Sequence, residues 1–353
     1  MKLVYFLVFC ISLPLGLRSE TAGLEEPPLL TKSQHRDLFI PYGLPPIPWP
    51  ADNPYTPEKA ELGRLLYFDT RLSTDGTISC ASCHAPSEVF SDRRPLSIGI
   101  KGQVGSRHSM TIINSAYQPI LFWDGRAKTL EEQCKGPLSN PKEMTLFNDP
   151  HEAHWHCHER VKNIPGYRKL FKQVFGNDIC SIDEIAQAIA TFERTVLSGN
   201  SPYDRYIKGD VTAMTPEEVH GYQLFSSKGC MDCHHGTSFS NGAFENIGVG
   251  MDVPNPDLGR YMITHNEKDW GAFKTPILRE VANRHPYMHD GSLKTLEEVI
   301  DYYDRGGIPN KNLHPLMQPL HLKPEEKKAL ISFLKALSGE GWKHIKEPKK
   351  FPE

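Results

Sequence analysis

The sequence predicts a mostly α-helical fold built from two similar halves, each a small helical domain with long loops. Apolar residues recur with helical spacing along both halves, whereas the alternation typical of a half-buried strand is scarce. The same helix start, Thr-Pro-Glu, occurs at residues 56–58 and again at 215–217. In each half the expected helix runs directly into a Cys-x-x-Cys-His pentapeptide, so the chain repeats one arrangement twice.

The two pentapeptides cover residues 80–84 and 230–234. In each, two thiols have the spacing that forms thioether bonds with the vinyl groups of one haem, and the next residue offers an imidazole to its iron. One match alone could be a zinc half-site, a redox dithiol or chance, but two matches that both end in His favour haem. We therefore expect two cytochrome c-like haem domains that hold two covalently bound haem c groups. The expected attachment residues are Cys80, Cys83, Cys230 and Cys233, and the expected axial ligands are His84 and His234.

The N-terminal residues have the pattern of a secretory signal. Lys2 precedes an apolar run over residues 3–17 that is too short to cross a bilayer, so residues 1–19 are expected to be a cleaved signal peptide. Haem attachment to this motif takes place outside the bacterial cytoplasm, which agrees with a periplasmic location. No later stretch is long and apolar enough to span a membrane, and the net charge of −3 gives no indication of nucleic-acid binding.

The rest of the chain divides by composition and by the two motifs. The Pro-rich residues 20–50 are expected to form an extended strap. A first haem domain is expected over residues 51–205 and a second over 206–340, with a tail at 341–353. An apolar fraction of 39% is sufficient for a core in each domain.

Helix signals in the first domain follow in chain order. Thr56 has the position of an N-cap, and an apolar stripe runs from Leu62 to Leu66. Residues 85–120 have the character of a loop, since helical spacing is rare there. Helical patterns return over residues 129–134, 151–163, 165–175 and 181–196, the last with a capping box at its start.

The second domain repeats this order. A helix that begins after Thr215 leads into the second motif, and a loop-rich span follows over residues 235–290. Helices are expected again over residues 293–303 and 324–337. Loops as long as these are uncommon unless they are functional, so we expect them to surround the cofactors.

Five stretches around the motifs resemble one known family. The sequence is similar to the bacterial dihaem cytochrome c peroxidase and MauG family from about residue 48 to residue 339. The matching stretches lie at residues 62–69, 122–126, 140–144, 192–195 and 286–292. The resemblance implies an enzyme that reacts with hydrogen peroxide at the N-terminal haem, while the C-terminal haem shares the oxidising equivalents.

The resemblance also assigns residues to the first haem. In relatives whose resting form is closed, a His in the loop after the motif caps the distal side of the iron. Ile100 stands at that position, and because an aliphatic side chain cannot ligate iron, an open face is implied; His108 is the alternative cap. Glu143 matches the family's distal Glu and Gln133 its companion Gln, a pair suited to move a proton between the two oxygens of peroxide.

Two aromatic residues are assigned in the same way. Trp123 matches the Trp that lies between the haems and relays electrons in the family. Tyr303 stands where peroxidases carry the Met that ligates the second iron, and a phenolate favours more oxidised iron than a thioether does. Met317 is the alternative ligand, and Tyr302 is the alternative if the register is shifted by one residue. A Tyr ligand points to a MauG-like oxidant.

Two departures limit the resemblance. MauG has a Trp two residues before the second motif, through which it oxidises its protein partner, and Lys228 stands there in this chain. The family also holds a calcium ion between the haems, by an Asn side chain and two carbonyl groups. The corresponding residues are His108, Arg284 and Pro286, and because His is a poor ligand for calcium, the ion is in doubt.

Two further groups of residues have no counterpart in the family. His151, His154, His156, Cys157 and His158 lie close together on an expected helix, and His154 and His158 have a spacing that can bind copper or zinc; a solvated helix is the alternative. Apart from the haem motifs and the signal peptide, the remaining cysteines are Cys134, Cys157 and Cys180. Three thiols form at most one disulfide, and the sequence does not decide its pairing.

The sequence leaves three functions to compare. The first is an enzyme that uses peroxide to oxidise Tyr or Trp side chains of a secreted partner protein. The second is a peroxidase that reduces peroxide with electrons from a small cytochrome or copper protein. The third is a dihaem electron carrier without turnover. Glu143, Gln133 and Ile100 argue against the carrier, whereas Tyr303 in place of Met separates the first two.

Overall fold

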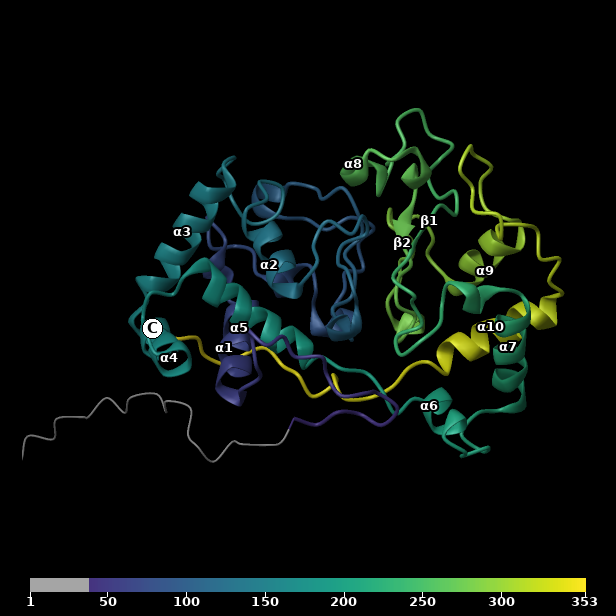
Figure 1. Ribbon diagram of the computed structural model, residues 1–353, viewed down its shortest axis with the longest axis horizontal. Coiled ribbons are helices and arrows are strands. Elements are labelled where there is room, and N and C mark those ends of the chain that lie inside the picture. Colours follow the sequence, from purple (N-terminus) through teal and green to yellow (C-terminus); the bar gives the residue numbers. More distant parts are fainter. Residues whose placement is uncertain (1–37) are drawn as a thin grey trace, which may run out of the picture. The chain divides into compact units, whose positions relative to one another are not determined.

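The structure is a computed structural model that describes residues 38–353 (Figure 1). The predicted signal peptide, residues 1–19, and the strap as far as residue 37 lie outside the described residues. The predicted mostly helical fold is confirmed, because the described residues form helices joined by long loops, with a single short pair of strands.

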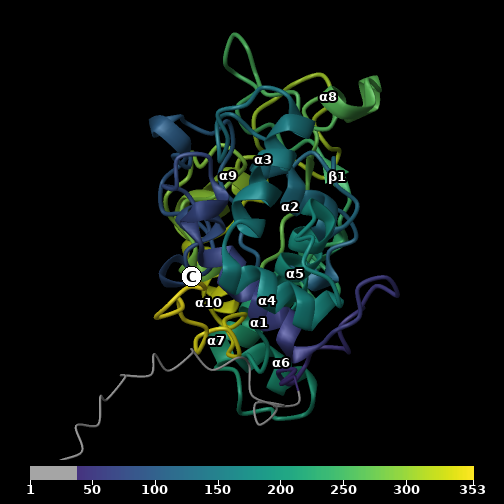
Figure 2. The ribbon, with the colours of Figure 1, turned by 90° about the vertical axis from the view of Figure 1, so that its left-hand side faces the viewer.

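Helices α1 (Pro57–Phe68) and α5 (Ile182–Arg194) form the framework of the first half (Figure 2). The Thr56 side chain accepts the backbone hydrogen bond that its N-cap position predicts. The helices come very close at Gly63, where a Cβ atom would lie 1.8 Å from the carbonyl oxygen of Ala188. This crossing therefore requires glycine, since any side chain would push the helices apart.

Three more helices complete the first half: α2 (Leu130–Leu138), α3 (Pro150–Lys162) and α4 (Pro165–Phe175). They lie where the helical periodicity predicts them. Tyr167 on α4 is fully buried, and its hydroxyl donates a hydrogen bond of 2.8 Å to the carboxylate of Asp69, the residue after α1. This buried contact joins α4 to the end of α1.

Helices α7 (Pro216–Ser227) and α10 (Pro324–Lys335) form the framework of the second half (Figure 1). Here the close crossing is at Gly221, where a Cβ atom would lie 1.9 Å from the carbonyl oxygen of Ala329. The fully buried Phe333 lies next to this crossing, in a cluster with aromatic rings of the same half. The second half therefore uses the same glycine-mediated helix pair as the first.

The remaining elements are short. They are α6 (Pro202–Ile207), α8 (Tyr261–Thr264), α9 (Leu296–Asp304) and the strands β1 (Phe244–Glu245) and β2 (Phe273–Lys274), which pair antiparallel. The sequence predicts α9, although the helix begins three residues after the predicted start at residue 293. It does not predict α6, α8 or the strands, because elements of two to six residues are too short to show a period.

The two long loops are confirmed. Residues 85–120 contain only single 3₁₀ turns and isolated bridges, and residues 235–290 contain single turns, α8 and the strand pair. The 3₁₀ turns of the described chain are Thr70–Leu72, Cys80–Ser82, Pro86–Glu88, Ile100–Gly102, Ser115–Tyr117, Cys230–Asp232, Glu267–Asp269 and Val281–Asn283.

The described part of the strap packs on the first half through apolar side chains. Leu38, Ile40 and Leu44 lie against a small cluster that includes Ile47 and Leu197. From residue 38 to residue 50 the chain has one short turn and no helix or strand. Among residues 38–353, no helix is both long and apolar enough to cross a bilayer.

Candidate haem sites

Both Cys-x-x-Cys-His motifs fold into the same turn. Residues Cys80–Ser82 form a 3₁₀ turn, and the backbone N–H of His84 donates to the carbonyl oxygen of Cys80 at 3.0 Å. Residues Cys230–Asp232 form the equivalent turn, and the N–H of His234 donates to the carbonyl oxygen of Cys230 at 2.9 Å. Each turn brings two thiols and one imidazole together, as haem attachment requires.

One cavity brings together residues that are far apart in the sequence. Its lining contains Cys80, Cys83, His84, His108, Trp123, Gln133, Glu143, Lys274 and Arg284. Burial lowers the pKa of His84, which favours the neutral imidazole that can ligate iron. The residues predicted to serve the first haem therefore meet in one place.

The residues of this cavity fit a haem. Lys274 is 2% exposed, and the Nε atom of Arg284 is buried without a hydrogen-bond partner. Neither side chain forms an ion pair with another residue of the described chain, and buried cations require an anion. A haem brings two propionate carboxylates to such a site. Cys80 and Cys83 would hold the haem covalently, and His84 would ligate its iron.

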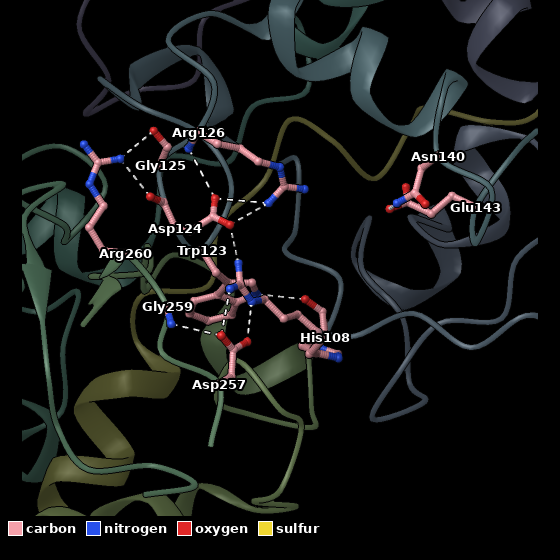
Figure 3. Close-up of polar contacts among 11 residues, drawn as sticks. His108, Trp123, Asp124, Gly125, Arg126, Asn140, Glu143, Asp257, Gly259 and Arg260 are labelled. Carbon is pink, nitrogen blue, oxygen red and sulfur yellow. Dashed lines mark hydrogen bonds and ion pairs between the residues drawn. The ribbon is translucent and has the colours of Figure 1, made fainter. Parts of the chain in front are cut away.

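Glu143 lies in the wall of this cavity, on the turn after α2. Its Oε1 atom accepts a hydrogen bond of 2.6 Å from the Asn140 side chain (Figure 3). Burial raises the pKa of Glu143, although the Asn140 hydrogen bond and the charge of Arg126 lower it in part. A carboxyl group whose pKa is moved toward neutral pH can both accept and return a proton.

The loop after the first motif supports Glu143. The backbone N–H of Ile100 donates to the carbonyl oxygen of Glu143 at 2.9 Å, and the Ile100 side chain is fully buried. At Gly99 a Cβ atom would lie 2.1 Å from the carbonyl oxygen of Lys142, so only glycine permits this approach. The Ile100 side chain does not line the cavity. Its backbone hydrogen bond links this loop to the Glu143 turn.

His108 lies elsewhere in the same cavity. Its Nδ1 atom is 3.2 Å from the carbonyl oxygens of both Arg94 and Pro95. Figure 3 shows His108 beside Trp123 and well apart from Glu143. A residue that capped the distal face of the iron would lie next to the distal carboxyl group, so this arrangement argues against His108 as the cap.

Trp123 lies where the two halves meet. Its Nε1 atom donates to the carbonyl oxygen of His108 at 2.8 Å, and its carbonyl oxygen accepts from the backbone N–H of Lys274 at 2.7 Å. Its ring meets the ring of His289 edge-on, with centroids 6.4 Å apart. The indole is thus buried between residues of both halves.

An ion-pair network that the sequence did not reveal fixes this junction (Figure 3). Arg107 pairs with Asp124 of the first half and with Asp257 of the second, each at 2.6 Å. Arg260 donates from the second half to the carbonyl oxygens of Asp124 and Gly125, each at 2.8 Å. No local pattern marks a pair separated by 150 residues, so only the fold shows it.

Glu193 is a second buried carboxyl group that sequence reasoning missed as a site residue. It lines the first cavity, and its Oε2 atom has no hydrogen-bond partner. Burial raises its pKa to about 8, and the nearby charge of Arg194 only partly opposes this. The carboxyl group is therefore largely protonated at neutral pH.

The second motif lies beside α9. Burial lowers the pKa of His234 to about 4, and its Nδ1 atom is 3.0 Å from the carbonyl oxygen of Phe239. Desolvation raises the pKa of Tyr303 most, and the thiols of Cys230 and Cys233 raise it further. A free phenol here is neutral, so ligation requires iron to displace the proton, as bound metal ions do.

The alternative ligands of the second iron are engaged elsewhere. The hydroxyl of Tyr302 donates to the carbonyl oxygen of Ile247 at 2.9 Å, and only 2% of the residue is exposed. Met317 packs in an apolar cluster with Tyr302 and Val249. Tyr303 also packs against this cluster, but the thiols of the second motif act on the pKa of Tyr303 and not on that of Tyr302.

Lys228, which stands where MauG has a Trp, lies at the C-terminal end of α7. It caps the C-terminus of α7, where its backbone N–H donates to the carbonyl oxygen of Leu224. Its Nζ atom donates to the carbonyl oxygen of Leu320 at 3.2 Å. The structure offers no aromatic substitute at this position.

The His-rich segment does not assemble a metal site. His154 Nε2 is 2.9 Å from the carbonyl oxygen of Lys135, and the ring of His156 stacks on Phe147 with centroids 4.2 Å apart. Residues 38–353 contain no group of three or more His, Cys, Asp or Glu side chains placed to hold a metal ion. The remaining cysteines, Cys134, Cys157 and Cys180, are buried free thiols.

Comparison with known proteins agrees with this geometry. The family model described as di-haem cytochrome c peroxidase matches residues 57–212. A cytochrome c551 peroxidase of Nitrosomonas europaea is 38% identical over 295 residues, which cover 83% of this chain and 84% of the relative. A methylamine utilization protein MauG of Methylophilus methylotrophus is 39% identical over 298 residues, covering 83% and 86%.

Solved structures show the same fold. A MauG-like protein associated with microbial copper homeostasis superposes with a TM-score of 0.78 at 33% sequence identity, covering 86% of this chain and 96% of that one. The diheme peroxidase BthA of Burkholderia thailandensis superposes with a TM-score of 0.70 at 23% identity.

Proposed function

Because the chain belongs to the dihaem cytochrome c peroxidase and MauG family, we propose that it uses hydrogen peroxide to oxidise Tyr or Trp side chains of a secreted partner protein. Peroxide would react at the first haem, and the second, Tyr-ligated haem would share the oxidising equivalents. The protein would act in the periplasm. Two points support this proposal: Tyr303 stands in the sequence where the peroxidases carry their Met ligand, and the thiols of the second motif act on its pKa.

Each haem would supply the iron that reacts with peroxide or stores its oxidising equivalents, and the protein would move the proton from one oxygen of peroxide to the other. Glu143, held by Asn140, takes the proton from the near oxygen of peroxide and returns it to the far oxygen, which leaves as water. Gln133 lies in the same cavity wall and can orient the peroxide through its amide.

Trp123 connects the two halves. Its indole is 9% exposed, its ring contacts His289, and its backbone contacts Lys274, so it provides a packed aromatic group between the haem sites. With both haems bound, this side chain would relay electrons from the second haem to the first. Oxidation of a partner at a distance then requires no open channel to the first haem.

The second candidate is a cytochrome c peroxidase. The Nitrosomonas europaea relative has that name and matches this chain as well as MauG does. In that case a small cytochrome or copper protein would donate electrons, and peroxide would be reduced to water. The third candidate, a carrier without turnover, is disfavoured because Glu143 and Gln133 line the first cavity.

The test adds one equivalent of peroxide to the ferric holoprotein and follows its absorption spectrum without an electron donor. We expect an oxidised state that lasts well beyond mixing in the wild type, and a much shorter lifetime in Tyr303→Met. Rapid return of the wild type to its resting spectrum, together with fast oxidation of an added reduced small cytochrome c, would favour the peroxidase.

A further inference from the structure

The junction where the family resemblance places calcium has an unusual charge in this chain. His108 and Arg284 both line the cavity there, together with Lys274 and Trp123. The expected calcium ligands were the side chain at position 108 and the carbonyl oxygens of Arg284 and Pro286. The oxygen atoms and charged side chains around these ligands determine whether a divalent cation can bind there.

Calcium requires six to eight oxygen ligands, usually with carboxylates among them. At this junction the carboxylates of Asp124 and Asp257 are already paired with Arg107. The His108 side chain offers only ring nitrogen, and its Nδ1 atom lies against the carbonyl oxygens of Arg94 and Pro95. The side-chain oxygen that the resemblance assigns to a calcium site at position 108 is therefore missing in this chain.

Two cations lie at the same place. The Nζ atom of Lys274 donates to the Gln118 side chain at 2.9 Å, and Arg284 donates to the carbonyl oxygen of Ile277. Neither is paired with a carboxylate of the described chain, and the Nε atom of Arg284 is buried without a partner. The charge of the buried Glu280 reaches Arg284, but neither cation forms a direct ion pair, and two such cations repel a divalent cation and attract an anion.

The electrostatic effects of Arg284 extend into both halves. Burial lowers its pKa to about 10 and that of Lys274 to about 8, so both remain mainly charged at neutral pH. The charge of Arg284 contributes to lowering the pKa of His108 in the first half and of His234 in the second. One fixed positive charge thus acts on the surroundings of both haem motifs.

We propose that Arg284 and Lys274 take the place of a calcium ion at this junction, as two fixed cations that bind carboxylates of the haem propionate class. Together they carry the same charge as one calcium ion. The proposal rests on the binding of two haems but not on the identity of the oxidised substrate. The protein should therefore need no calcium for the coupling of its two halves.

The first test uses the wild-type holoprotein. After dialysis against calcium chloride and desalting, elemental analysis should find iron but less than about one tenth of an equivalent of calcium per chain. The electron paramagnetic resonance (EPR) spectrum and the melting temperature should be the same with EDTA and with added calcium. One equivalent of calcium per chain, whose removal by EDTA changes the spectrum, would overturn the proposal.

A second test creates the missing site. The double variant His108→Asn/Arg284→Ala supplies an amide oxygen and removes one cation, so we expect it to bind calcium at least tenfold more tightly than the wild type in isothermal titration. Arg168→Ala removes an exposed arginine that pairs with Asp178 and serves as the matched control, with no change in calcium binding. Calcium binding of the wild type as tight as that of the double variant would contradict the proposal, and so would a failure of the folded double variant to gain binding.

Discussion

The two halves share one scaffold and differ in what they present to their haem motifs. In both, a helix that starts with a capped Thr-Pro-Glu crosses a partner helix at a glycine, Gly63 against Ala188 and Gly221 against Ala329. Both then enter a Cys-x-x-Cys-His turn of the same conformation. The scaffold therefore attaches a haem, and the surrounding loops and helices determine its chemistry.

The difference lies in the groups near each motif. The first cavity has two buried carboxyl groups, Glu143 and Glu193, whose pKa values are both raised by burial. The second motif has the phenol of Tyr303 instead. Carboxyl groups move protons, whereas a phenolate ligand stabilises oxidised iron. The same fold can thus serve one haem that reacts with peroxide and one that stores oxidising equivalents.

The largest expected effect comes from breaking the shared scaffold. Gly63→Ala and Gly221→Ala would each place a Cβ atom within 2 Å of a backbone oxygen, so each should lower the free energy of unfolding by about 3 kcal/mol or more. Gly105→Ala is the control, because its Cβ atom would meet no atom closer than 3.5 Å. Thermal unfolding of the holoprotein measures all three. A loss confined to one half would show that the crossings are not equivalent.

The next prediction concerns the carboxyl group that only the first half carries. Glu143→Gln should leave both haems bound but slow the reaction with peroxide by roughly 10²–10⁴, because the amide cannot accept the proton. Stopped-flow absorption gives the rate, and the exposed Glu152→Gln on α3 is the control. An unchanged rate in Glu143→Gln would remove this residue from the proton transfer.

Glu193 can be replaced by its counterpart from the second half. Phe192 on α5 and Phe333 on α10 lie at the two glycine crossings, so Glu193 corresponds to Leu334. Its pKa of about 8 exceeds the ordinary value of 4.5, so the folded protein favours the protonated form. Protonated Glu193 contributes on the order of a few kcal/mol to the free energy of unfolding. This contribution is complete below about pH 4.5 and is lost as the pH rises toward 8. Glu193→Leu should remove this pH dependence in chemical unfolding. A wild type with equal stability at both ends of this range would contradict the assignment.

The smallest effect is the pH dependence of the peroxide reaction. Burial raises the pKa of Glu143, and the carboxylate is the form that accepts the proton, so the rate should rise as the pH passes through that raised pKa. The increase should be about tenfold per pH unit well below the pKa. In Glu143→Gln this limb should be absent, and a wild-type profile that falls over the same range would contradict the role as a base.

The parts of the fold that the sequence predicted are those with local signals. The N-caps, the helical periodicity and the two motifs placed α1, α5, α7 and α10, and the resemblance grouped Glu143, Gln133 and Trp123 around the first haem. The contacts at the junction of the two halves could not be predicted in this way. The pairing of Arg107 with Asp257 and the hydrogen bond from Lys274 to Gln118 depend on how segments far apart in the chain meet, which no local pattern encodes. The predicted domain boundaries at residues 205 and 206 remain predictions.

The most direct test of the difference between the halves is low-temperature EPR of the resting ferric protein. We expect one high-spin haem, from the open first site, and one low-spin haem ligated by Tyr303. Tyr303→Phe should remove the low-spin signal, and Met317→Ala should leave it intact. Two low-spin signals at rest, or a low-spin signal that persists in Tyr303→Phe and disappears in Met317→Ala, would contradict the account.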